Sequence, residues 1–175
     1  MIEHIRFRDK KYRSVRLHIR PYADFSDILK VLNTIEFPSD SMSGEQVMYA
    51  VLELLNNSLR AHKEKEIERE ILTEFSVTDG KLYIKVRDWG GGFDTSNLPY
   101  SLQEDVDNIN TNDESFQEYR EHHGYIRFGI GLYVVRKTFS TFNLYFIDER
   151  EFPADWESGK VQGTCIELTM EDIEE

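Results

Sequence analysis

Two segments that flank Asp79-Gly80 constrain the fold of this 175-residue chain more than any other feature. Residues 71–78 and 81–88 have equal length, and in the second one apolar side chains alternate with polar or aromatic ones. An Asp-Gly pair supplies the positive φ angles that a tight two-residue turn requires. The pattern therefore predicts an antiparallel hairpin with one apolar face.

The strongest helical pattern of the chain begins at Ser43. Ser43 and Gln46 have the spacing of a capping box, which would satisfy two backbone donors at the start of a helix. The apolar residues that follow recur at helical spacing: Val47, Ala50, Val51, Leu54 and Leu55. The charged run at 63–70 is predicted to be the solvated end of this helix.

Shorter patterns predict the other elements. Strands are expected at 2–8, 13–20, 143–148 and 161–169, helices at 25–35 and 130–140, and a polar turn at 9–11. Residues 94–128 are polar and acidic and lack periodicity, which is typical of a lid, a binding loop or disorder. The length predicts a single domain over 1–175, in which 1–42 form N-terminal strands and one helix.

Composition excludes several classes of protein. The formal net charge is −12, which argues against general nucleic-acid binding, because neutralising phosphates requires clustered cations. One basic tract, residues 6–20, departs from this balance and has the character of a charged edge strand, a docking edge or a homodimer contact. A single cysteine, Cys165, fits a reducing, cytoplasmic compartment. No run of about 18 apolar residues exists, so no membrane span is expected.

Four short segments carry residues suited to chemistry. Glu53 and Asn57 lie one helical turn apart, so an amide oxygen suited to Mg²⁺ and a carboxylate suited to orienting or deprotonating a nucleophile share one helix face. Asp88 ends a predicted strand before a run of glycines and can accept a hydrogen bond from an amine. Glycines that enter a helix, as Gly129 and Gly131 do, let backbone N–H groups approach a phosphate. The fourth segment, Gly163-Thr164, enters the last predicted strand.

In this order the four segments resemble the N, G1, G2 and G3 boxes of the GHKL superfamily, the ATPases of gyrase, heat-shock chaperones, histidine kinases and MutL. The resemblance extends from about residue 45 to residue 169, and the stretches 86–94 and 129–139 are especially similar to the histidine-kinase form. It implies an α+β fold: a two-layer α/β sandwich with a mixed sheet and helices on one face. It also implies ATP and Mg²⁺ as ligands.

The resemblance implies a role for each matching position. Asn57 would coordinate Mg²⁺, Glu53 would be the catalytic base or water-orienting group, and Asp88 would accept the adenine amino group. Residues 94–128 would form the ATP lid. Because this lid is acidic, Arg127, Arg136 or Lys137 would have to help hold the triphosphate. The remaining nucleotide contacts would come from Gly90, Gly92, Gly129, Gly131, Leu132 and Thr164. Many relatives place Ala and His in the reverse order of Ala61-His62, so the resemblance assigns no role to His62.

Three functions are compatible with these features. The first is a protein kinase that resembles anti-sigma factor serine kinases and acts on a partner such as an anti-anti-sigma factor or sigma factor. The second is a histidine-kinase-like catalytic domain that phosphorylates a histidine in trans, within a pathway of the response-regulator type. The third is a non-catalytic module in which nucleotide orders the lid and the lid presents a binding surface.

Overall fold

A five-stranded sheet and a layer of helices form the body of the molecule. The computed structural model describes residues 2–37, 44–122 and 130–171. The sheet has the order β3-β5-β6-β8-β7, and all four of its pairings are antiparallel. Its strands are β3 (Ser14–Ile19), β5 (Ile71–Thr78), β6 (Lys81–Asp88), β7 (Thr141–Ile147) and β8 (Gly163–Glu171).

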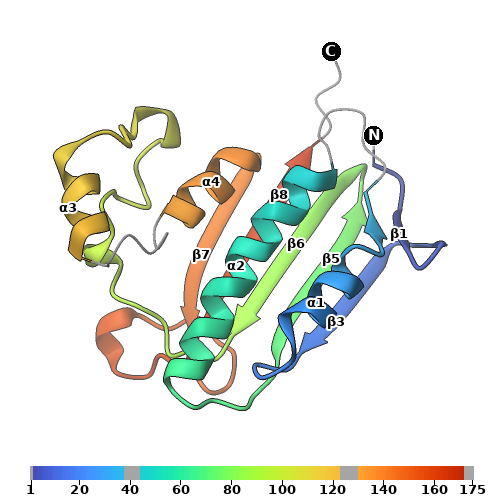
Figure 1. Cartoon of the computed structure of the whole chain (residues 1–175), viewed down its shortest axis with the longest axis horizontal. Helices are drawn as coiled ribbons and strands as arrows, with labels where there is room; N and C mark the ends of the chain where they lie inside the picture. Colours follow the sequence, from blue (N-terminus) through green and yellow to red (C-terminus); the bar gives the residue numbers. More distant parts are fainter. Residues whose placement is uncertain (1, 38–43, 123–129, 172–175) are drawn as a thin grey trace.

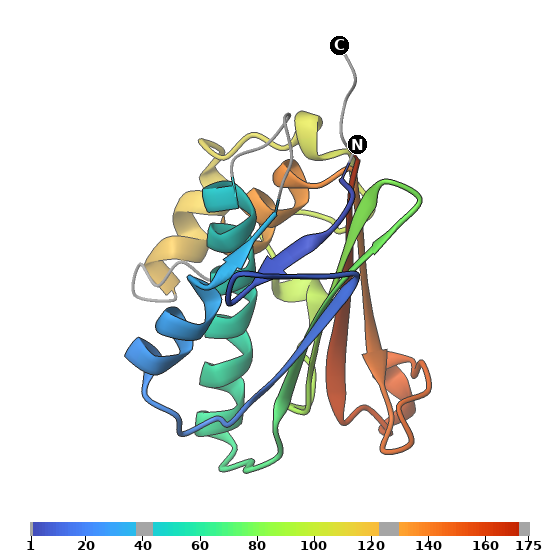
Figure 2. The same cartoon turned by 90° about the vertical axis from the view of Figure 1, so that its right-hand side faces the viewer.

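The helices lie on one side of this sheet, as Figures 1 and 2 show together. The long helix α2 (Gly44–Glu64) crosses the middle of the sheet, with α1 (Phe25–Leu32) and α4 (Ile130–Thr138) on either side of it. The fourth helix, α3 (Glu114–His122), lies beyond α4 at the edge of the molecule. The two-layer α+β sandwich that the resemblance implied is therefore confirmed.

The sheet differs in one detail from the implied mixed sheet. Because β8 lies between β6 and β7 and is antiparallel to both, β6 and β7 run in the same direction without pairing with each other. The connection through α4 thus joins β6 to β7, which are parallel to each other although every hydrogen-bonded pair of strands in the sheet is antiparallel.

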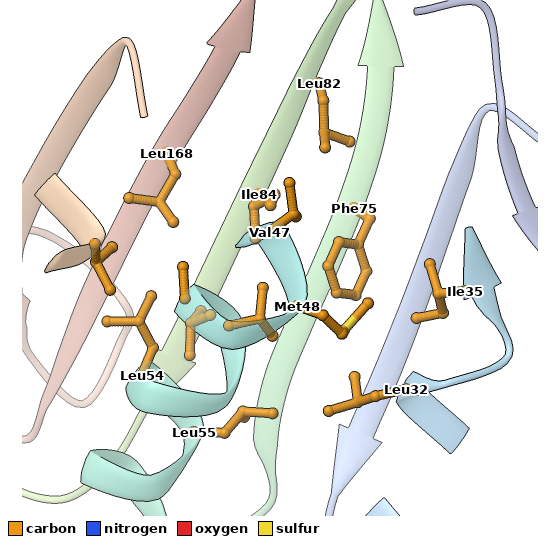
Figure 3. Close-up of a cluster of buried hydrophobic side chains, with 14 of the residues drawn as sticks. Leu32, Ile35, Val47, Met48, Leu54, Leu55, Phe75, Leu82, Ile84 and Leu168 are labelled. Carbon is orange, nitrogen blue, oxygen red and sulfur yellow. The ribbon is translucent and has the colours of Figure 1, made fainter. Parts of the chain in front are cut away.

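The core lies between α2 and the sheet. Leu54 and Leu55 of α2 belong to one buried cluster with Phe75 of β5 and with Leu82 and Ile84 of β6 (Figure 3), and each of these side chains is at most 2% exposed. The apolar stripe that the sequence showed in residues 47–55 is the buried stripe of the helix. Burial of a side chain of this size contributes about 1.5–3 kcal/mol to stability.

The hairpin predicted around Asp79-Gly80 is confirmed, with both strands at the predicted bounds. Asp79 and Gly80 have φ angles of 51° and 76°. Positive φ at both central positions is the signature of the turn type whose twist matches that of a two-stranded ribbon.

The N-terminal segment differs from its prediction. Residues 2–20 form three strands rather than two, because the chain already turns at Arg8-Asp9, where φ is positive at both residues. Strand β1 (Ile5–Phe7) pairs with β2 (Lys10–Tyr12) and with β4 (Ile35–Glu36) in a separate sheet, whereas β3 joins the large one. The predicted helix at 25–35 ends at Leu32, so Ile35 is free to pair with Phe7.

Candidate functional site

A pocket of about 150 Å³ lies where the C-terminal half of α2 meets the end of β6 and the start of β8. Its walls include six of the predicted site residues: Asn57, Asp88, Gly90, Gly92, Leu132 and Thr164. The hollows on the uncovered face of the sheet and beside β7 are larger, about 620 and 730 Å³, but they are lined by none of these residues. The pocket thus brings together predicted residues that lie up to 107 positions apart in the chain, from Asn57 to Thr164.

Asp88 is held in place from two directions. The Ser58 hydroxyl of α2 donates to Oδ2 of Asp88 at 2.7 Å, and the backbone N–H of Gly90 donates to Oδ1 at 2.9 Å. Asp88 is also the register partner of Thr164 at the end of the β6–β8 ladder, and Thr164 is only 5% exposed. A carboxylate fixed in this way keeps lone pairs available on the pocket side, since each oxygen can accept more than one hydrogen bond.

Two glycines let the backbone pass close to its neighbours. A Cβ atom on Gly90 would lie 2.6 Å from the Cβ of Ala61, and one on Gly163 would overlap the carbonyl oxygen of Asp88. Gly92 also has a φ of +67°, which other residues rarely adopt. A side chain at positions 90 or 163 would therefore push apart the walls that shape the pocket.

Glu53 and Asn57 occupy the other end of the site. A Cβ atom on Gly131 would lie 2.6 Å from Oε2 of Glu53, so the Glu53 carboxylate packs against the first turn of α4. One turn along α2, Oδ1 of Asn57 accepts a hydrogen bond from Arg60 at 3.0 Å. The predicted phosphate residue Gly129 lies outside the described residues, as do Ser43 and Arg127.

The cations that line the pocket are not Arg136 or Lys137, and Arg127 lies outside the described residues. Arg60 and Lys65 line the pocket, and the Lys65 ammonium donates to the carbonyl oxygen of Gly90. Arg136 instead donates to the carbonyl oxygens of Ser101 and Glu104 and so holds the lid. The i,i+3 spacing of Asn57 and Arg60 was a sequence signal for a cation beside the amide. No such signal marked Lys65, which belongs to a charged run that was predicted to be solvated.

The lid contains more structure than the sequence indicated. Tyr100, Ile109 and Phe116 form a small core of their own, against which Tyr133 of α4 packs. Within this segment α3 is a helix that no periodicity predicted, because Phe116 and Tyr119 are its only apolar side chains. Burial raises the pKa of Tyr119 to about 12, and the nearby Arg60 opposes this rise. Tyr119 of the lid therefore lies near Arg60 of the site.

His62 also belongs to the site, although the resemblance gave it no role. It is fully buried, and its Nε2 accepts the backbone N–H of Trp89 at 2.8 Å. Burial lowers the pKa of His62, and the charge of Asp88 opposes this effect. The sequence did contain an indication of this role: His62 lies four residues after Ser58 on α2, so the two side chains share one helix face.

A family model described as histidine kinase-, DNA gyrase B- and HSP90-like ATPase matches residues 42–173. The chain belongs to this family. The matched range includes all four predicted motifs and the lid, so the chain contains an ATP-binding module of the GHKL type. A search of curated proteins finds no match.

Two further findings concern ligands and membranes. Among the described residues, no cluster of three or more His, Cys, Asp or Glu side chains could hold a metal ion. A metal at this site would therefore depend on few protein ligands and on the phosphates, as Mg²⁺ commonly does. None of the described helices has the length and apolar character to cross a bilayer.

Proposed function

We propose that the chain binds Mg-ATP and transfers the γ-phosphoryl group to a partner protein, in the manner of the anti-sigma factor serine kinases that it resembles. We further propose that residues 1–175 act as a single ATP-binding domain. Phosphoryl transfer needs mainly positioning and charge neutralisation, which a preformed pocket with fixed polar groups can supply.

The adenine end of the nucleotide is assigned to the pocket at Asp88. At about 150 Å³ this pocket is smaller than the roughly 300–1,000 Å³ of most ligand sites, so it holds only part of a nucleotide. The Asp88 carboxylate would accept the exocyclic amine, while Gly90, Gly92 and Thr164 would lie close to the ring. The phosphates would then extend along α2 toward Gly131 and Leu132 at the start of α4, where backbone N–H groups favour anions.

The residues present fit Mg²⁺. Asn57 presents an amide oxygen at the wall of the pocket, where a guanidinium, that of Arg60, is its partner. An oxygen that attracts one cation suits another, and Mg²⁺ typically takes one or two protein oxygens besides phosphates and water. When bound, the metal would neutralise phosphate charge, and Asn57 would hold it.

The position of Glu53 is the observation that carries the assignment of catalysis. Its carboxylate packs against Gly131, at the end of the site where the terminal phosphate would lie, rather than at the adenine end. A carboxylate there can accept a proton from an attacking hydroxyl, an effect worth about 10²–10⁴-fold in rate.

One observation favours the non-catalytic alternative. The lid has its own apolar core and rests on α4 through Tyr100, Tyr133 and Arg136. Because α4 also begins at the phosphate end, nucleotide binding could change the surface that the lid presents without any transfer. A histidine acceptor in trans remains the second catalytic alternative.

In the deciding experiment, the wild-type protein and a Glu53→Gln variant are each incubated with a cell extract, γ-labelled ATP and Mg²⁺. The partner protein that binds to each is recovered, and its phosphorylated residues are mapped. Glu45→Gln is the matched control, because Glu45 lies in the first turn of the same helix and is exposed. We expect transfer to a serine that falls at least about 100-fold in Glu53→Gln and is unchanged in the control. Phosphohistidine would favour the second alternative, and nucleotide-dependent retention without any phosphate on the partner would favour the third.

A further inference from the structure

The inference concerns the buried imidazole of His62, which no motif explains. Its Nε2 accepts the backbone N–H of Trp89 at 2.8 Å, and an accepting ring nitrogen must carry no proton. The proton of the neutral ring therefore resides on Nδ1, which is buried and has no hydrogen-bond partner among the described residues. The side chain is 0% exposed, so water cannot replace the Trp89 contact.

His62 is one of three α2 residues that hold the turn at residues 88–90. Ser58 donates to the Asp88 side chain, His62 accepts from the Trp89 backbone, and Ala61 lies against Gly90. Positions 58, 61 and 62 share one face of a helix, and Figure 1 shows the C-terminal end of α2 beside the end of β6. The helix thus fixes both the carboxylate and the backbone of the turn.

The Trp89 side chain fixes the same turn from the opposite side. Trp89 is 6% exposed, and the guanidinium of Arg69 lies over its ring, 3.3 Å from the ring centre. The bond from the Trp89 N–H to His62 then holds the peptide group between Asp88 and Trp89.

Charged side chains from β6 and from the segment after α2 lie around His62 and the turn that it holds. On β6, Asp88 lies close enough to favour the charged imidazole, and Arg87 lies 6.0 Å from the Trp89 ring centre. In the segment after α2, Arg69 covers Trp89 and Lys65 binds the Gly90 carbonyl. Glu151 in turn pairs with Arg69 at 3.7 Å and with Arg87 at 2.6 Å, so two anions and three cations lie around the turn.

We propose that His62 is a positioning residue of the nucleotide pocket: its neutral imidazole fixes the Trp89 peptide so that Asp88 and Gly90 face the adenine, and the pocket is competent only while Nε2 is unprotonated. This inference rests on the proposed assignment of adenine to Asp88. Protonation would set two N–H groups against each other at 2.8 Å and turn the peptide. It would also place a cation beside the carboxylate that has to accept the adenine amine.

The test measures the affinity for a non-hydrolysable ATP analogue between pH 5 and pH 8 in the wild-type protein and in His62→Gln. A glutamine oxygen can accept the Trp89 N–H but cannot be protonated in this range. His18→Gln is the matched control, because His18 lies on β3, is exposed and pairs with Glu70 rather than with the site. The ligand's own phosphate ionises equally in all three proteins, so ratios of affinities isolate the effect of position 62.

We expect the wild-type affinity to fall relative to His62→Gln by up to about tenfold per pH unit below the pKa of His62, with His18→Gln following the wild type. Equal pH profiles in wild type and His62→Gln would overturn the proposal. Should His62→Gln not fold, ¹⁵N spectra of the wild-type imidazoles decide: Nε2 of His62 must be the unprotonated nitrogen, and the analogue must lower its pKa. A protonated Nε2, or a pKa that nucleotide leaves unchanged, would refute the proposal. Absence of any nucleotide binding at pH 8 would instead refute the proposed function.

Discussion

Replacing Asp88 by asparagine tests the adenine site with the smallest change in shape. In the protein the carboxylate accepts from Ser58 at 2.7 Å and from the Gly90 N–H at 2.9 Å. An asparagine oxygen can still accept from Gly90, and the Ser58 hydroxyl can rotate to accept from the new amide. We therefore expect the free energy of unfolding to change by less than about 1 kcal/mol.

The effect on nucleotide binding should be larger. The adenine amine would lose a charged acceptor and meet an N–H donor, and a hydrogen bond to a charged group contributes about 1.5–3 kcal/mol. This range corresponds to roughly 10- to 150-fold weaker binding of ATP. Guanine carries a carbonyl oxygen where adenine carries its amine, so the variant should bind GTP no worse than the wild type does.

Calorimetric titration with ATP and GTP analogues measures both affinities in wild type, Asp88→Asn and a control, Asp27→Asn. Asp27 lies on α1 in an exposed ion pair with Lys30, and its replacement should leave both affinities unchanged. The reasoning fails if Asp88→Asn keeps the wild-type preference for ATP over GTP while its thermal midpoint shows an intact fold.

Four further outcomes are expected. Asn57→Ala should abolish the difference between ATP affinities measured with Mg²⁺ and with chelator, and a persisting Mg²⁺ effect would remove Asn57 as a ligand. Gly163→Ala, whose Cβ would overlap the Asp88 carbonyl, should lower the urea-unfolding free energy by up to about 3 kcal/mol, and an unchanged value would contradict that close approach. Arg136→Ala should speed proteolysis within the lid, at residues 95–108, with little effect on the global thermal midpoint. The pKa of His62 in the folded protein is lowered from 6.5, so the unfolded chain binds a proton at a higher pH than the folded protein does. The contribution of His62 to the free energy of unfolding should therefore be fully present above about pH 6.5. Below that pH the free energy of unfolding should fall by up to about 1.4 kcal/mol per pH unit, and His62→Gln should not show this loss.

The sequence predicted the parts of the fold that local physics determines. The hairpin at residues 71–88 has a turn pair with one favoured geometry and alternating side chains, so its bounds were found to the residue. The long helix carries a strong apolar stripe and was predicted equally well as far as its described start at Gly44. In both cases local propensity and burial agree.

Other parts depend on contacts that no local pattern records. The turn at Arg8-Asp9 lacks a glycine, so nothing marked it as a two-residue turn, and β4 is only two residues long. Helix α3 buries Phe116 against other lid residues rather than against the main core, which leaves it without a clear stripe. These elements owe their form to tertiary packing.

The same distinction applies to the site. Residues in motif positions, such as Asn57 and Asp88, were named from the sequence and line one pocket. Ser58 and His62 were missed as contacts of the Asp88–Trp89 turn, because their partners lie 30 and 27 residues away and are joined to them only by the folded sheet. Spacing within a helix shows which side chains share a face, but it does not show which strand that face meets.

The angular arrangement of α2 explains how one helix can serve both the core and the site. Leu54, Leu55 and Leu59 are at most 6% exposed and anchor the helix to the sheet, while Asn57 and Ser58 line the pocket together with Leu54. Rotation of the helix about its axis would move both sets together, so the packing of the leucines fixes the direction in which the polar groups point. A core substitution such as a shortened leucine should therefore weaken nucleotide binding beyond its cost in stability, while changes on the polar face can alter binding at almost constant stability.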